Sequence, residues 1–71
     1  MKKKVFIEGM SCKHCVAHVE EALKELDGVK KVKVSLDDKN AVVDFKDEIE
    51  DSAIKAAVED AGYDVVKIEN I

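Results

Sequence analysis

The spacing of apolar residues in this chain changes from every second residue to every third or fourth residue and back again, twice. Alternation at every second residue is typical of a strand with one buried face, and spacing at three and four residues is typical of a helix with one buried stripe. The chain is therefore divided in the order strand, helix, strand, strand, helix, strand. Few architectures accommodate this order, because each apolar face must be covered by another element.

The first half of the chain carries one strand and one helix. Val5 and Ile7 alternate on one side of a strand that ends at Gly9, with Phe6 on the outward side. A helical stripe of apolar residues follows: Val16, Val19, Ala22, Leu23 and Leu26. We expect Ser11 to cap the start of this helix and Gly28 to end it, because these residue types are favoured at those positions.

The second half carries two strands, a helix and a final strand. Turn-forming residues at 37–40 separate two alternating segments, and Gly62 ends the second helix. The inward residues are expected to be Val32, Val34 and Leu36, then Ala41, Val43 and Phe45, then Ile54, Ala57, Val58 and Ala61 on the helix, and Val66 and Ile68 on the last strand.

The two halves also resemble each other, as expected of a duplicated unit. Aligning Gly28 with Gly62 superposes residues 32–34 on residues 66–68. Each helix has a single apolar stripe, so both helices should cover the same face of one sheet. The predicted fold is an α+β, ferredoxin-like βαββαβ sandwich with a four-stranded antiparallel sheet, forming a single domain over residues 1–71. Cysteines occur only in the first half, which predicts one metal site.

Size and charge exclude several classes of function. A chain of 71 residues hides only roughly 60% of the surface that its unfolded form exposes, so it cannot spare a deep active-site cleft. Its 12 basic residues are all lysines, and its net charge is −4. Arginine is the usual side chain for bidentate phosphate recognition, and binding to nucleic acid needs a basic surface. The composition therefore disfavours a nucleic-acid partner.

The amino-terminal segment predicts a cytoplasmic protein with no membrane association. Lys2, Lys3 and Lys4 read as the solvated start of the first strand. The apolar residues at 5–7 are far fewer than the roughly 7–15 of an export signal, and no run approaches the roughly 20 needed to cross a membrane. If Met1 is the true start, the chain remains in the cytoplasm. Thiols are kept reduced there, so two cysteines spaced C-x-x-C indicate metal or redox chemistry.

Cys12 and Cys15 lie where the first strand gives way to the first helix. The first amides of a helix lack intrahelical acceptors and carry partial positive charge, which favours the thiolate that binds metal. We expect Cys15, in the first helical turn, to have a lower pKa than Cys12. Two thiolates suit a soft ion of low coordination number such as Cu(I), whereas a structural zinc site normally has four ligands.

The two histidines are the remaining candidate ligands near this pair. His14 lies between the cysteines and is expected to point to solvent. His18 follows Cys15 by three positions and reads as a half-exposed helix residue rather than as a ligand. The metal site is therefore predicted to consist of Cys12 and Cys15 alone.

A redox dithiol and a structural cysteine pair are both disfavoured. Thioredoxin-like oxidoreductases also place C-x-x-C between a strand and a helix, but they need a larger fold and a cis-proline beside the dithiol, and this chain has no proline. Structural, unreactive cysteines are disfavoured because the polar residues Lys13 and His14 separate them.

The stretch Gly9-Met10-Ser11-Cys12-Lys13-His14-Cys15 resembles the G-M-x-C-x-x-C signature of the heavy-metal-associated domain family. The sequence is similar to bacterial cytoplasmic copper chaperones of that family along essentially its whole length. Further agreement comes from Leu-Asp-Gly-Val at 26–29 and Ala-Gly-Tyr-Asp-Val at 61–65. The combined match is far more specific than C-x-x-C alone.

This resemblance implies carriage of Cu(I) in the cytoplasm and its transfer by ligand exchange to a copper-transporting P-type ATPase, with no catalysis. It implies that Met10 is a buried anchor under the metal loop. It also places Tyr63 at a position near the metal site, where the side chain would shield the ion. The alternative for Tyr63 is an ordinary core aromatic at the start of the last strand.

Other members of the same family remain as alternatives. The chain could be an amino-terminal metal-binding domain of a copper ATPase, although the start at Met1 and the end at Ile71 without a linker favour a free-standing protein. A mercury carrier is less favoured, since periplasmic carriers need an export signal. The expected partners are the ATPase metal-binding domain and a copper-responsive regulator. The apo protein is expected to be a monomer, and two chains could share copper through four thiolates, joined by His14.

Overall fold

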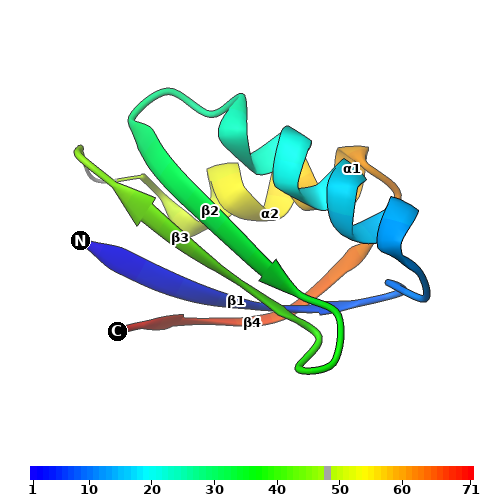
Figure 1. The fold of residues 1–71 in the computed structure, drawn as a ribbon. Helices are drawn as coiled ribbons and strands as arrows, with labels where there is room; N and C mark the ends of the chain where they lie inside the picture. Colours follow the sequence, from blue (N-terminus) through cyan, green and yellow to red (C-terminus); the bar gives the residue numbers. More distant parts are fainter. Residues whose placement is uncertain (48) are drawn as a thin grey trace.

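The structure, a computed structural model, describes residues 1–47 and 49–71 and has the predicted order of elements (Figure 1). These are β1 (Lys2–Glu8), α1 (Lys13–Lys24), β2 (Val29–Ser35), β3 (Asn40–Phe45), α2 (Asp51–Asp60) and β4 (Asp64–Asn70). The strands form one antiparallel sheet in the order β2-β3-β1-β4. Both helices lie on the same face of it, which confirms the ferredoxin-like sandwich.

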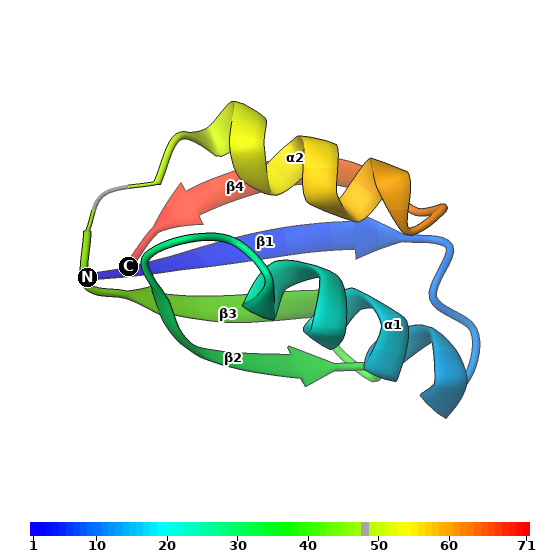
Figure 2. The same cartoon turned by 90° about the horizontal axis from the view of Figure 1, so that it is seen from above.

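The helices divide the face of the sheet between them. Seen from above, α2 lies on the β4 side and α1 on the β2 side (Figure 2). The two chain termini lie together at one end of the sandwich (Figure 1). The β1–α1 loop and the α2–β4 connection lie together at the opposite end. The topology thus brings two segments that are about fifty residues apart in sequence to the same place.

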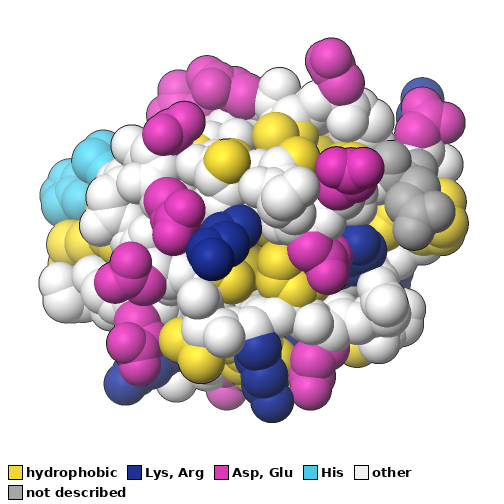
Figure 3. Space-filling view, turned by 180° about the vertical axis from the view of Figure 1, so that it is seen from behind, with side chains coloured by type: hydrophobic (Ala, Val, Ile, Leu, Met, Phe, Trp, Pro, Cys, Tyr) yellow, Lys and Arg dark blue, Asp and Glu magenta, His cyan; other side chains and the backbone are white. Residues whose placement is uncertain are grey.

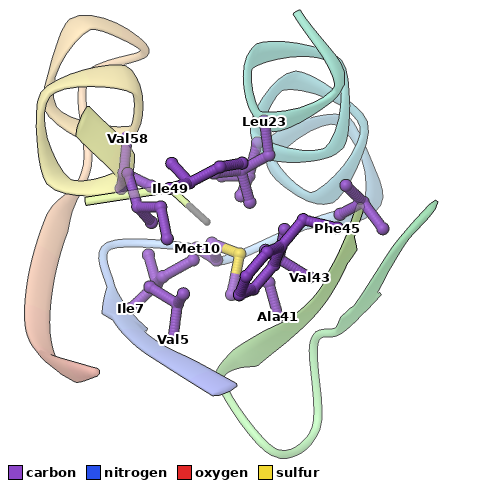
Figure 4. Packing of buried hydrophobic residues seen from close by; sticks show 12 residues of the cluster. Val5, Ile7, Met10, Leu23, Ala41, Val43, Phe45, Ile49 and Val58 are labelled. Carbon is purple, nitrogen blue, oxygen red and sulfur yellow. The ribbon is translucent and has the colours of Figure 1, made fainter. Parts of the chain in front are cut away.

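The core lies between the sheet and the two helices, where the alternation and the helical stripes placed it (Figure 4). Val5 and Ile7 are buried on β1, and Ala41, Val43 and Phe45 are buried on β3. Val19 and Leu23 cover them from α1, and Ile54 and Val58 cover them from α2. The predicted inward faces of these elements are therefore confirmed, and the core is complete without any contribution from the cysteine sulfurs.

Both predicted ends of α1 are wrong. The residue at the start is Cys12, not Ser11: its backbone is extended, and its carbonyl accepts hydrogen bonds from the amides of Cys15 and Val16 at 3.1 and 3.3 Å. The helix ends with Glu25 as its C-cap, three residues before Gly28. Gly28 instead lies in the turn into β2, where its carbonyl accepts a hydrogen bond from the Lys46 amide at 2.8 Å.

The prediction that Lys3 is solvated is also wrong. Its side chain is only 8% exposed, because strand alternation places it on the same inward side as Val5 and Ile7. The ammonium group donates a hydrogen bond to the Ile49 carbonyl at 3.0 Å and forms an ion pair with Asp51. These contacts satisfy the buried charge and fasten β1 to the start of α2.

The orientation expected for Val66 differs because β4 contains a bulge. Phe6 pairs with Lys67, whereas the next residue, Ile7, pairs with Val65. Val66 is therefore an extra residue on β4, and it is 58% exposed. Val65 and Ile68 pack against the core.

Candidate metal centre

The two cysteines lie at the tip of the sandwich, on either side of the point where α1 begins. Cys12 is the N-cap residue and is exposed, while Cys15 is the third residue of the helix and is half-buried. The first turn of the helix brings their side chains together, and the two sulfur atoms are 3.4 Å apart. Both thiols are free, so the two sulfurs can reach a single ion.

Met10 fixes the base of this loop. Its side chain is 7% exposed and belongs to the hydrophobic core (Figure 4). Burial of a thioether of this size anchors the backbone immediately before Ser11 and Cys12. The expected role of Met10 as a packing residue agrees with this position.

The end of α2 presents Tyr63 to the same loop. Gly62 has a positive φ of 96°, its amide donates to the Glu59 carbonyl at 2.9 Å, and the Tyr63 amide donates to the Val58 carbonyl at 3.2 Å. This pair of bonds is a Schellman motif, which fixes the direction of the chain after the helix. The positive φ of Gly62 therefore permits a chain direction that holds Tyr63 at the end of the molecule where the β1–α1 loop lies.

Tyr63 packs closely against Gly9 at the end of β1. Gly9 has a φ of +100°, and a Cβ atom on this residue would lie 3.3 Å from Cδ1 of Tyr63. Any larger residue at position 9 would require both a strained backbone and a displaced ring. The glycine of the signature thus makes room for the tyrosine, a relation between the two halves of the chain that no sequence pattern reveals.

The Cys15 thiol is strongly acidified, with a pKa of about 6 against an ordinary value of 9.0. The largest cause is a hydrogen bond from the Tyr63 hydroxyl to the thiolate, followed by the Ser11 backbone amide and the Cys12 side chain. The same hydrogen bond raises the pKa of Tyr63. The expected acidification of Cys15 is found, but its principal source is an aromatic hydroxyl from the far end of the sequence.

The two histidines are the other candidate ligands near the dithiol. His14 and His18 both lie in α1, and both are exposed. Across residues 1–47 and 49–71, no group of three or more His, Cys, Asp or Glu side chains is arranged to hold a metal ion. The candidate centre in this part of the chain therefore offers two sulfur ligands, with Met10 beneath the loop and Tyr63 beside Cys15.

This arrangement has a definite chemical capacity. Two thiolate ligands favour a soft ion, and the low pKa of Cys15 supplies one of them at neutral pH. The exposure of Cys12 leaves a side from which another thiolate can approach a bound ion. The site therefore has the donors needed to bind a soft ion and an exposed side suited to ligand exchange.

No helix in the described residues has the length and apolar character required to span a membrane.

Comparison with known proteins agrees with the fold and the loop. The model of the heavy-metal-associated domain matches residues 4–64. A copper chaperone CopZ of Staphylococcus saprophyticus is 53% identical over 60 residues, covering 83% of this chain and 88% of the relative. A copper-transporting ATPase of Rhizobium meliloti is 48% identical over 61 residues, which cover 86% of this chain and 7% of the ATPase.

Among solved structures, a CopZ metallochaperone superposes with a TM-score of 0.87 at 42% identity, covering 93% of this chain and all of the other. The family match runs from β1 through the C-x-x-C loop and both helices to the first residue of β4. The chain therefore belongs to the heavy-metal-associated domain family.

Proposed function

We propose that this protein is a copper chaperone that holds one Cu(I) ion between Cys12 and Cys15. The observation that carries the proposal is the pair of sulfurs 3.4 Å apart, one acidified and half-buried and the other exposed. The names of the relatives support copper as the metal. The soft, two-ligand donor set supports Cu(I) as its oxidation state and disfavours Zn(II), which takes four ligands in structural sites.

Capture begins at Cys15, because its thiolate is the form that predominates at neutral pH. The ion then closes onto Cys12, which loses its proton to solvent. During transfer, a thiolate of the partner adds to the ion from the exposed Cys12 side and gives a three-coordinate intermediate. One original sulfur then leaves and takes up a proton. Capture adds thiolate ligands to the ion and transfer replaces one thiolate with another, so the oxidation state of copper is unchanged throughout. The proposed role is carriage of the ion, without catalysis.

The proposed partner is the metal-binding domain of a copper-transporting P-type ATPase. The similarity to the Rhizobium meliloti ATPase supports this choice, since chaperone and acceptor would present related loops to each other. A copper-responsive regulator is a second recipient. We place the exchange in the cytoplasm, where thiols stay reduced. Residues 1–71 would act as one domain, which is monomeric without copper. Two chains could share copper through four thiolates, with His14 joining as a further ligand.

A metal-binding domain belonging to a copper ATPase is the second candidate function. It is favoured by the 48% identity to the Rhizobium meliloti enzyme, and it would use the same site. Immunoblotting of cell extracts with an antibody to this chain separates the two candidates. A band near 7.9 kDa supports the free chaperone, and a band of ATPase size in the membrane fraction supports the second function.

Competition with a Cu(I) chelator under reducing conditions tests the metal assignment. We expect the protein to withdraw one equivalent of Cu(I) from the chelator, and we expect Cys12→Ser and Cys15→Ser each to abolish withdrawal. Lys13→Ala, a change between the two ligands, is the matched control and should retain binding. A preference for Zn(II) equal to that for Cu(I) would rule out the copper assignment.

A further inference from the structure

His14 and His18 are the two metal-ligating side chains that the dithiol site does not use. They lie four residues apart in the regular part of α1, and both are exposed. Histidine side chains lie together at one end of the molecule in Figure 3. We propose that His14 and His18 form a second metal site, separate from the dithiol, that binds a divalent transition-metal ion through two imidazoles, with Cu(II) preferred.

The helix supplies the geometry for such a chelate. Residues i and i+4 face the same side of a helix, with Cβ atoms roughly 5–6 Å apart. Zinc-dependent proteases bind their metal with two histidines at this same spacing on a helix. Residues 14 and 18 both lie within Lys13–Lys24, so the spacing is held by helical backbone and not by a loop.

The surrounding charge favours a cation at His18. This side chain lines a shallow surface hollow of about 250 Å³ together with Glu21 and Glu25 from α1 and the small residues Ala22 and Ala61. Glu21 follows His18 by three residues and so lies on the same side of the helix. Lys13 and the positive end of the helix dipole oppose a cation at His14, but the dipole acts mainly within the first turn. His18 and the carboxylates lie beyond that turn.

The ligand type sets the choice of ion. Imidazole suits Zn(II), Ni(II) and Cu(II), and among divalent ions of this series Cu(II) binds such donors most tightly. No third protein ligand joins the pair, because the described residues contain no cluster of three metal-ligating side chains. Water would complete the coordination, so the protein imposes no geometry that could reverse the intrinsic preference for Cu(II).

The two sites differ in the chemistry of their ligands and in the burial of Cys15. Cys15 is half-buried and packs against the core, whereas the histidines are exposed. Thiolates select soft Cu(I), and imidazoles accept the harder divalent ions. One chain would therefore offer separate sites for the two oxidation states of copper. The histidine site requires neither cysteine, so it stands independently of the proposed function.

The test uses the Cys12→Ser/Cys15→Ser double variant of the full chain, because Cu(II) oxidises thiols. Titration with Cu(II) is followed by calorimetry and by the NMR signals of the two imidazole rings. We expect one ion per chain and selective paramagnetic broadening of both rings. His18→Ala and His14→Ala in this background should each weaken binding by about tenfold or more, since changes beyond the first ligand shell already cost 10–100-fold.

Lys13→Ala in the same background is the matched control, because Lys13 is an exposed neighbour of His14 that the proposed site does not use. It should retain or slightly improve binding. Far-UV circular dichroism shows whether each variant keeps its helices. The proposal is overturned if His18→Ala binds Cu(II) as tightly as its parent, which would place the Cu(II) ligands elsewhere on the chain. It is also overturned if the cysteine-free protein binds no Cu(II). Chelator competition for Cu(I) should not change in His18→Ala with both cysteines present, so this outcome is independent of the chaperone proposal.

Discussion

At the scale of single residues, the contact between Tyr63 and Cys15 does the most to prepare the site. The tyrosine hydroxyl is the largest cause of the low pKa of the Cys15 thiol. The position of Tyr63 depends on the turn at Gly62 that ends α2 and on the absence of a side chain at Gly9, against which the ring packs. A thiolate at neutral pH is thus produced by a contact between the two halves of the duplicated fold.

We expect Tyr63→Phe to raise the pKa of Cys15 from about 6 toward its ordinary 9.0, because the ring remains while the hydrogen bond to the thiolate is lost. Alkylation rates of Cys15 against pH, resolved by peptide mass spectrometry, measure the change. At neutral pH the variant should react more slowly. Phe6→Tyr, an aromatic change on the outer face of the sheet, is the control. An unchanged dependence of the alkylation rate on pH would show that the start of α1, and not Tyr63, mainly lowers the pKa of Cys15.

The same thiol links stability to pH. The folded-state pKa of Cys15 is lower than the unfolded value of 9.0, so the unfolded chain binds more protons between pH 6 and pH 9. The contribution of Cys15 to stability is therefore complete above pH 9 and is lost as the pH falls through about 6. Urea unfolding of the reduced apo protein at both limits should show a larger loss of stability in the wild type than in Cys15→Ser. Equal losses would contradict the assignment.

At the scale of elements, the buried Lys3 joins β1 to the start of α2 at the end of the molecule away from the metal loop. Its ammonium reaches the Ile49 carbonyl and the Asp51 carboxylate. Asp51 is 61% exposed, so the ion pair itself contributes little, and the hydrogen bond to the carbonyl is the more important contact.

We expect Lys3→Met to destabilise the protein by about 1–3 kcal/mol, because the Ile49 carbonyl loses its donor in a buried position. Lys2→Met, one residue earlier on the exposed side of the strand, should change stability by no more than about 0.5 kcal/mol. Urea denaturation of the two variants gives the comparison. Equal effects would show that Lys3 contributes only through strand propensity.

The elements themselves could be predicted from periodicity, while several details could not. Val5 and Ile7 indicate the inward side of β1, and the register places Lys3 on that same side. A lysine nevertheless predicts an exposed position by its residue type. Val66 follows no alternation because a bulge shifts the pairing, and the pattern of apolar residues carries no signal for an extra residue. Both errors arise where tertiary contacts override the local pattern.

The residues of the candidate site could be predicted from the sequence, while one of their main interactions could not. Cys12 and Cys15 follow from spacing alone, and Met10 and Tyr63 follow from resemblance to the family. The effect of Tyr63 on the Cys15 thiol could not be predicted from either source, because it depends on how the end of α2 meets the end of β1 in space. Cys12 as N-cap was missed because serine is the more common residue at that position.

At the scale of the whole molecule, the buried core is separate from the proposed metal ligands. Among the described residues, the buried apolar core includes neither cysteine, and Cys15 only packs against it. The reduced, metal-free protein should therefore give a far-UV circular dichroism spectrum with both helix and strand, unlike a zinc finger, which unfolds without its ion. A coil spectrum that becomes structured only when copper is added would contradict this.

Leu23→Ala tests how much a buried side chain of this core contributes to stability. Leu23 is fully buried on α1, so truncation should cost about 2–5 kcal/mol in the free energy of unfolding. Lys24→Ala, the exposed neighbour, is the control, and it should cost far less. Cu(I) stoichiometry should remain one per chain in both variants at a temperature where they are folded. A loss of copper binding in folded Leu23→Ala would show that the loop depends on the core beneath it.

The bulge in β4 affects the tendency of the sheet to pair with strands of other molecules at high concentration. β4 and β2 are the outer strands of the sheet, and such strands expose amides and carbonyls to which a strand of another molecule can add. The extra residue Val66 interrupts that row on β4, and the exposed lysines 30, 31 and 33 put positive charge along β2. Both edge strands therefore carry features that oppose the addition of a strand from another molecule, and growth into fibrils should be disfavoured.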